Sequence, residues 1–369
     1  MTKGIYIHIP FCLSKCTYCD FYSVSKDTKT MELYTNALIN EIEKSSLFHK
    51  GDNIDTLYFG GGTPSVLPLY LFEKIVEALF KNFNLDLKEF TIEANPASDI
   101  AFDKYKSLGV DRVSLGVQSL NDDILSLIGR KHNSQLAVDT ILKATDCFEK
   151  VSCDLMIGLP QQSVEDVVYA TDFLSKKVNH ISMYMLKLSD TVPMYHQLIE
   201  NKFTLPDDDF TVDMYDAAYS TMKSNGFDRY EISNFAKLGY ESLHNLKYWK
   251  REEYIGLGAA AHGFVNNSRY YNPSSIDDYI HGKNYGSNNV NFEFIDKDNA
   301  IFEFIMLAFR LKDGIDVNLI NKMFNISFFD KYAIQLKQLK DFLDISSTHI
   351  AIKEDKLLLE SAIAREFLI

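Results

Sequence analysis

Three of the five cysteines in the chain lie within eight residues near its N-terminus. Cys12, Cys16 and Cys19 follow the segment IYIHIP with the spacing C-x3-C-x2-C. Three neighbouring thiolates suit a soft metal centre, whereas a structural zinc ion takes a fourth protein ligand, and Cys147 and Cys153 are far away in the sequence. A [4Fe-4S] cube bound by three cysteines keeps one iron open for another ligand. The clustering therefore predicts cluster ligation and disfavours the alternative of three buried cysteines that serve as small hydrophobes.

The composition favours a cytoplasmic globular protein that does not bind nucleic acid. Its 369 residues, 46% of them hydrophobic, suffice for one large domain and a smaller one. A net charge of −13 argues against general binding to a phosphate backbone, which requires a basic face. The sequence has no leader-like segment and no apolar run of membrane-spanning length. The odd number of cysteines and the size of the chain disfavour a disulfide framework.

Strand-like and helix-like segments alternate over the first two-thirds of the chain. The pattern predicts strands over 4–9, 55–59, 89–94, 112–117, 152–157 and 180–187. Helices are predicted between them, over 30–45, 69–83, 100–108, 134–148 and 164–175. Repeated strand–helix units indicate a parallel sheet covered by helices, either as a barrel or as a doubly wound sheet. No GxGxxG motif opens the first helix, so a dinucleotide-binding fold is not supported.

Several predicted strands have one apolar and one polar face. In VSCDLMIG, for example, Val151, Cys153 and Leu155 alternate with Ser152 and Asp154. A parallel strand that is buried on both faces would be apolar throughout. The alternation therefore favours a barrel with helices outside and an interior polar enough for a polar ligand, and it places Cys153 in the core. The alternative, an antiparallel sheet with one face in solvent, is disfavoured by the intervening helices.

The pattern changes after residue 205. A helix is predicted from Asp207 to Gly226, the segment DRYEISNFA is strand-like, and HNLKYWKREEYIGLGAAAHGF looks irregular. The Asn-rich segment from His281 is typical of a linker. A further helix is predicted from Asn299, with one face formed by Phe302, Ile305, Met306 and Phe309. Shorter helices and a pair of strands in HIAIKEDKLLLE complete a small, winged-helix-like α+β domain. We expect a core barrel over 1–235, a connecting region over 236–290 and a C-terminal domain over 291–369.

A glycine triplet follows the second predicted strand, in YFGGGTPSVL. Glycines let the backbone approach a ligand closely, and their N–H groups can receive a carboxylate, although a tight strand–helix turn would also explain the triplet. Arginine suits a ligand carboxylate and aspartate suits a ribose hydroxyl, while any one such residue alone is more often an ordinary loop residue or part of an ion pair. Later strands and loops supply such polar groups as Glu93, Gln118, Arg130 and Asp154.

The cysteine motif resembles that of radical S-adenosylmethionine (SAM) proteins, in which SAM chelates the open iron of the cluster. The segments YIHIPFC, GGGTPS, GVQS, GRKH and DLMIGLP also occur in the order and spacing of the oxygen-independent coproporphyrinogen III oxidase family, from Tyr6 to about His262. This resemblance implies an α/β fold with a partial (β/α)6 barrel of the TIM type. It implies a [4Fe-4S] cluster and SAM as cofactors, with SAM contacted by Tyr6, Tyr18, Gly61, Gly62, Thr63, Glu93, Gln118, Arg130 and Asp154.

Short features separate two branches of that family. The oxidases carry a fourth cysteine where this chain has Phe21, and they have an N-terminal extension where this chain starts shortly before the barrel. The segment HNLKYW resembles the H-N-x-x-Y-W motif of the heme chaperone branch. The resemblance therefore favours a protein that binds heme, passes it to an acceptor protein and takes electrons from a donor.

The same motif suggests a heme ligand. A neutral imidazole of His244 suits heme iron, and Tyr248 and Trp249 could stack on the macrocycle. Alternatively, His244 and Asn245 hold a loop by hydrogen bonds while Trp249 fills the core. The alternative function is that of the oxidases, which decarboxylate propionates oxidatively in heme biosynthesis. A third possibility, a transfer-RNA-modifying radical enzyme, lacks support beyond the cysteines.

Overall fold

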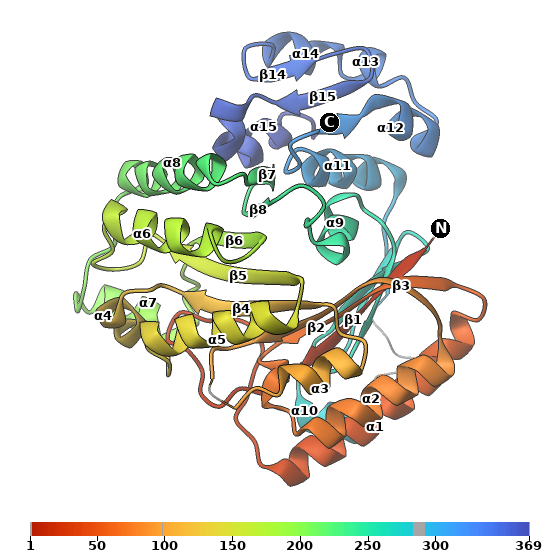
Figure 1. The fold of residues 1–369 in the computed structure, drawn as a ribbon. Helices are drawn as coiled ribbons and strands as arrows, with labels where there is room; N and C mark the ends of the chain where they lie inside the picture. Colours follow the sequence, from red (N-terminus) through yellow and green to blue (C-terminus); the bar gives the residue numbers. More distant parts are fainter. Residues whose placement is uncertain (1, 98, 283–291, 369) are drawn as a thin grey trace.

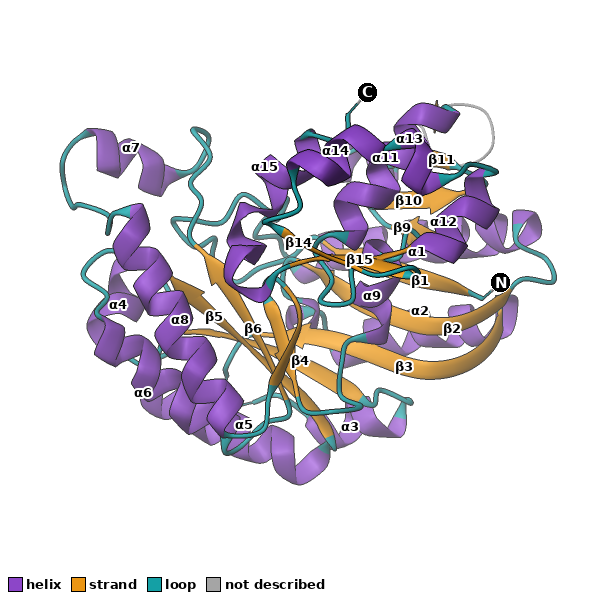
Figure 2. Cartoon of the chain, turned by 90° about the horizontal axis from the view of Figure 1, so that it is seen from above, coloured by secondary structure: helices purple, strands orange, loops and turns teal. Residues whose placement is uncertain are grey.

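The computed structural model describes residues 2–97, 99–282 and 292–368. Six parallel strands, paired in chain order, form the centre of a large curved sheet (Figures 1 and 2). The strands are β1 (Lys3–Ile9), β2 (Asn53–Gly61), β3 (Asn84–Ala94), β4 (Arg112–Gln118), β5 (Lys150–Ile157) and β6 (His180–Met185). The predicted strands and the partial (β/α)6 barrel are confirmed.

Helices connect these strands on the outside of the sheet (Figure 1). Most begin at a side-chain N-cap, such as Ser163, whose hydroxyl and whose backbone amide form a reciprocal capping box with Asp166. The predicted helix over 164–175 matches the observed bounds. The helices are α1 (Thr28–Phe48), α2 (Leu69–Asn82), α3 (Phe102–Ser107), α4 (Asp122–Leu127), α5 (Ser134–Cys147), α6 (Val164–Ser175), α7 (Pro193–Ile199) and α8 (Asp208–Ser224), with a 3₁₀ turn at η1 (Pro64–Val66).

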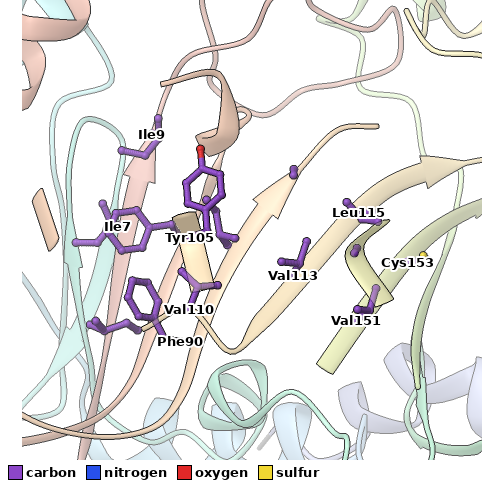
Figure 3. Packing of buried hydrophobic residues seen from close by; sticks show 14 of the residues in the cluster. Ile7, Ile9, Phe90, Tyr105, Val110, Val113, Leu115, Val151 and Cys153 are labelled. Atoms are coloured by element: carbon purple, nitrogen blue, oxygen red, sulfur yellow. The ribbon is translucent and has the colours of Figure 1, made fainter. Parts of the chain in front are cut away.

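The apolar faces of the parallel strands form the main core beneath the helices. Figure 3 shows Ile7, Val113, Leu115 and Val151 in this layer, with Cys153 beside them. All five are almost completely buried, and burial raises the pKa of the Cys153 thiol. The prediction that Cys153 belongs to the core is therefore confirmed.

Further strands extend the sheet on both sides, and their pairings are antiparallel except that β9 runs parallel to β1. β8 (Asn234–Ala236) and β7 (Asp228–Glu231) continue it beyond β6, as the strand-like DRYEISNFA predicted. Beyond β1 follow β9 (Tyr254–Leu257), β10 (His262–Val265), β11 (Ser268–Tyr271) and β12 (Glu293–Phe294). The expectation of an irregular segment here is wrong, because it contains α9 (Leu243–Trp249), β9 and β10. α10 (Ile276–Ile280) follows, and residues 283–291 of the predicted linker lie outside the described residues.

The C-terminal part has its own core and a small antiparallel sheet, ordered β13–β15–β14. It contains α11 (Lys297–Ala308), β13 (Ile315–Asp316), α12 (Val317–Phe324), α13 (Phe328–Lys331), α14 (Ala333–Gln338), β14 (Leu343–Ile345), β15 (His349–Ile352), η2 (Glu354–Leu359) and α15 (Glu360–Arg365). The predicted α+β character is confirmed. Across the described residues, no helix is both long and apolar enough to cross a membrane.

Two details of this domain differ from the sequence prediction. The buried face of α11 is formed by Ala300, Ile301, Phe304, Ile305 and Ala308, whereas Met306 is exposed. The second strand was also misplaced, since β15 pairs with the preceding β14 and the KLLLE segment begins in η2. In a helix that is apolar on most sides, periodicity alone does not identify the buried face. In a run of leucines, periodicity alone does not distinguish a strand from a helix.

Candidate functional site

The three predicted cluster ligands lie in one loop that leaves the carboxyl end of β1. Phe11 forms an isolated bridge with Val24, and the Cys12 amide donates to the Val24 carbonyl at 3.0 Å. Further along the loop, the amide and hydroxyl of Thr17 both donate to the carbonyl of Ile128 just after α4, at 3.3 and 3.1 Å. All three thiols are free and partly exposed. Hydrogen bonds to Val24 and Ile128 thus fix the loop that carries all three thiols.

The donor set fits a multinuclear cluster. Burial raises the pKa of the Cys19 thiol, and the neighbouring Cys16 and Cys12 raise it further, so the three sulfurs influence one another electrostatically. Within the described ranges, no group of three or more His, Cys, Asp and Glu side chains is arranged to hold a single metal ion. Three thiolates supplied by one loop are suited to three corners of an iron–sulfur cube.

The turn that follows β2 is hydrogen-bonded to the end of β1 and to the start of the cysteine loop. The Gly62 amide donates to the Ile9 carbonyl at 2.9 Å, and the Thr63 amide donates to the Phe11 carbonyl at 2.8 Å. A Cβ on Gly62 would lie 2.7 Å from the Phe11 carbonyl oxygen, so only glycine permits this approach. Thr63 also places its hydroxyl 3.4 Å from the Cys12 sulfur. These two amides therefore position the cysteine loop in this structure, and their predicted contact with SAM stays a prediction.

Two carboxylates share a narrow polar cavity inside the barrel. Glu93 accepts hydrogen bonds from the Tyr58 hydroxyl at 2.7 Å and from the Gly61 amide at 3.2 Å. Asp154 accepts one from the Ser114 hydroxyl at 3.2 Å. Burial raises the pKa of Glu93 to about 7, with a contribution from the charge of Asp154, and burial raises that of Asp154 to about 6. The cavity is therefore suited to a ligand that brings positive charge.

Arg130 connects this region to the cluster ligands. Its Nη2 donates to the Asn95 side-chain oxygen at 2.6 Å and to the Gly116 carbonyl, and its Nη1 lies 3.5 Å from the Cys16 sulfur. Gln118, at the end of β4, has a left-handed backbone conformation with φ of 68°. The guanidinium is thus placed to pair with an anionic group beside the cysteine loop.

The two predicted tyrosines lie at different places. The Tyr6 hydroxyl is 3.0 Å from His8 Nδ1, and its ring stacks on Tyr58 with centroids 6.2 Å apart, inside the barrel near Glu93. Tyr18 packs against the small apolar cluster around α4 and α7, next to the cysteine loop. The structure thus brings most of the predicted SAM residues to the interior and carboxyl rim of the barrel, and their contact with SAM stays a prediction.

His244 lies at the opposite, amino-terminal end of the strands. Its side chain is 0% exposed, with Nδ1 2.8 Å from the Thr56 hydroxyl and Nε2 2.8 Å from the Tyr248 hydroxyl. Its ring also stacks on Tyr58, and burial lowers its pKa to about 3. Both ring nitrogens are occupied, so ligation of iron by His244 requires α9 to leave this position.

A buried carboxylate that the sequence analysis did not identify holds α9 in place. Glu89 accepts hydrogen bonds from the amides of Leu243 and His244, both at 3.0 Å, and from the Ser242 hydroxyl at 3.3 Å. It also pairs with Arg112 Nε at 3.0 Å, and both side chains are almost fully buried. The sequence feature that could have identified this pair is the presence of opposite charges at the starts of two adjacent predicted strands. Glu89 and Arg112 thus fix α9 across the amino-terminal end of the barrel.

Comparison with known proteins agrees with this geometry. The radical SAM superfamily matches residues 6–174, and the HemN C-terminal domain matches residues 295–354. The heme chaperone HemW of Lactococcus lactis subsp. lactis is 35% identical over 342 residues, which cover 91% of this chain and 89% of that protein. The heme chaperone HemW of Bacillus subtilis is 37% identical over 285 residues, or 75% of each chain.

A solved structure shows the same fold. Coproporphyrinogen III oxidase (HemN) from Escherichia coli, a radical SAM enzyme, superposes with a TM-score of 0.87 at 21% identity, over 99% of this chain and 90% of that chain. The radical SAM assignment implies a [4Fe-4S] cluster and SAM. The family resemblance inferred from the cysteine, glycine and HNLKYW motifs is confirmed. The chain belongs to the radical SAM superfamily and, within it, to the family of the heme chaperone HemW.

Proposed function

We propose that this protein binds heme and transfers it to an acceptor protein, using a radical SAM core with a [4Fe-4S] cluster. The observation that carries the proposal is the 35% identity to a heme chaperone HemW over 89% of that protein's length. The structural likeness to the oxidase HemN supports the shared fold alone. Heme and an acceptor protein are therefore the partners proposed, together with an electron donor for the cluster and without nucleic acid.

In this proposal Cys12, Cys16 and Cys19 hold the cluster, which supplies one-electron chemistry toward SAM when it is bound. Glu93 and Asp154 compensate the positive charge of SAM from inside the barrel, and the other predicted SAM residues line the route to the cysteine loop. A cytoplasmic location is part of the proposal, because cluster ligation requires reduced thiols and the cytosol keeps thiols reduced.

One residue on the cysteine loop argues against the oxidase alternative. Phe21 occupies the position of the fourth cysteine that the resemblance implies for oxidases, and its side chain is 68% exposed. An exposed phenylalanine supplies no thiolate at this position, so the loop differs from that of the oxidases in a group capable of redox chemistry.

Anaerobic titration of heme into the cluster-reconstituted protein tests the proposal. We expect saturable binding with a Soret band distinct from that of free heme. A parallel incubation with coproporphyrinogen III, SAM and reductant should yield no protoporphyrinogen. Formation of protoporphyrinogen, or absence of heme binding, would overturn the proposal.

The same titration decides the predicted role of His244. If α9 undocks and His244 ligates iron, the His244→Ala variant should show a shifted Soret band and weaker heme binding, with its cluster content unchanged. His8→Ala and His262→Ala extend the series to the other imidazoles that the sequence analysis considered.

A further inference from the structure

A cavity outside the barrel is lined by residues from the carboxyl-terminal half of α1 and from strands β9, β10 and β11. Its volume is about 530 Å³, within the range of small-molecule and cofactor sites. The lining includes Lys3, Lys44, Phe48, His49, Asp52 and Tyr270. None of these side chains takes part in the cysteine loop or the polar cavity of the barrel.

Two of the aromatic side chains that line this cavity are exposed to solvent. Phe48 ends α1 and is 67% exposed, and Phe292 is 63% exposed. Phe292 lies beside the half-buried ring of Tyr270, with ring centroids 5.6 Å apart. Large apolar side chains are usually buried, so two exposed phenylalanines lining one cavity with a third ring indicate a flat apolar ligand.

An imidazole in the same cavity has the arrangement of a metal ligand. Nδ1 of His49 lies 3.0 Å from an oxygen of Asp52, which is itself fixed by Lys3 at 2.8 Å. Nε2 forms no hydrogen bond with the described residues, although the side chain is only 12% exposed. Histidines that ligate metals typically donate one ring N–H to a carboxylate, which orients the other nitrogen toward the metal.

The combination of a flat apolar wall and an oriented imidazole corresponds to one class of ligand. An iron tetrapyrrole offers a planar macrocycle and an axial position for an imidazole. We propose that this cavity binds heme, with His49 Nε2 as an axial ligand and the macrocycle against Phe48, Tyr270 and Phe292. The inference rests on the proposed function, because it locates the heme of that function.

The position of the cavity separates it from the cluster. Lys3 and Ile9 are the two ends of β1, and the cavity adjoins the first while the cysteine loop follows the second. Seven residues of extended strand span about 20 Å. Heme in this cavity would therefore be held without contact with the cluster, and its binding should not require SAM.

The test compares ferric heme with metal-free protoporphyrin IX, which has no iron for a histidine to ligate. In the full-length, cluster-reconstituted protein, His49→Ala should shift the Soret band and weaken heme binding at least tenfold, while leaving protoporphyrin binding unchanged. Phe48→Ser should weaken binding of both. The exposed His349 in the C-terminal domain supplies the matched control, and His349→Ala should behave as the unaltered protein. Thermal unfolding of each variant verifies that the fold is retained.

The outcomes separate this inference from the proposed function. If the unaltered chain binds heme and His49→Ala retains its spectrum and affinity, the assignment of this cavity is wrong while the proposed function stands. A spectrum that changes only in His244→Ala likewise overturns the assignment of this cavity and leaves the proposed function standing. If the unaltered chain binds neither heme nor protoporphyrin, the proposed function itself fails.

Discussion

Glu93 and Asp154 face one cavity inside the barrel, and burial raises the pKa of both carboxyl groups. A buried carboxyl with a raised pKa is neutral at a pH where an exposed one is ionised. A cationic ligand favours the ionised form, so SAM binding should release protons. This coupling makes the two carboxylates measurable contributors to SAM affinity.

The first prediction is that SAM affinity rises with pH. With a pKa of about 7 for Glu93, the ionised fraction grows about fivefold between pH 6 and pH 7, and the affinity should grow in proportion. In Glu93→Gln the affinity should be lower and its pH profile flatter, while Glu43→Gln on the exposed side of α1 should match the unaltered protein. Calorimetric titration at several pH values measures this. A pH-independent affinity in the unaltered protein would refute the assignment.

The second prediction concerns iron content. Cys12→Ser, Cys16→Ser and Cys19→Ser should each abolish stable cluster assembly, because a cube bound by two thiolates lacks a ligand. Cys153→Ala is the matched control, since Cys153 lies in the apolar core. Iron analysis after anaerobic reconstitution gives the result. Equal iron loss in Cys153→Ala would show that the ligands are misplaced.

At the scale of single residues, the sequence was sufficient to identify side chains whose chemistry follows from their type and from their neighbours in the chain. Three clustered cysteines and polar residues on one strand face are visible in the letters alone, and the structure brings Glu93 and Asp154 into one cavity as expected. Glu89 and Arg112 were missed because their significance depends on α9, which arrives from more than 120 residues further along the chain. The position of His49 could not be predicted either, because the cavity that it lines is completed by β9, β10 and β11, far along the chain.

At the scale of elements, α9 closes the amino-terminal end of the barrel and depends on one carboxylate. Glu89→Ala should destabilise the protein by about 3–5 kcal/mol, because it leaves buried Arg112 and two helix amides without their partner. Ser242→Ala, which removes the N-cap hydroxyl and its long hydrogen bond to Glu89 but leaves Glu89 paired with Arg112, should cost about 1 kcal/mol. Urea unfolding provides both values. Glu89→Ala with the stability of Glu43→Ala, an exposed carboxylate on α1, would contradict this account of α9.

The barrel strands and helices were predicted well because their hydrophobic periodicity is strong and repeated. The region after β8 was not, because β9 has only four residues and is defined by its pairing with β1, about 250 residues away. Gly256 within β9 has no room for a side chain, since a Cβ there would clash with the His262 carbonyl oxygen. Glycines that suggested a loop therefore serve close strand packing.

At the scale of the whole molecule, the C-terminal domain contacts α9 from outside the barrel. Arg310 follows α11 and places its guanidinium 4.4 Å from the centroid of the Trp249 ring on α9. Its Nη2 also pairs at 3.1 Å with Glu231 of β7, whose side chain is completely buried. The tryptophan of the HNLKYW motif thus packs between the two parts of the chain.

We predict that Arg310→Met loosens this junction. The loss of the partner of buried Glu231 should cost up to about 3–5 kcal/mol and should speed hydrogen exchange of the α9 amides. Lys312→Met is the matched control, because Lys312 and its partner Asp228 are both more than half exposed and such pairs contribute at most about 1 kcal/mol. Equal exchange rates in the two variants would show that the domain does not restrain α9.

A transfer measurement shows directly whether the chain binds heme and delivers it to an acceptor. The cluster-reconstituted protein, loaded with heme under anaerobic conditions, is mixed with the heme-free form of a b-type hemoprotein while the acceptor's Soret band is followed. We expect saturation of the acceptor at a rate that rises with acceptor concentration and is unchanged by a heme scavenger. A rate independent of the acceptor and suppressed by the scavenger would show release of free heme, and would contradict the proposed function.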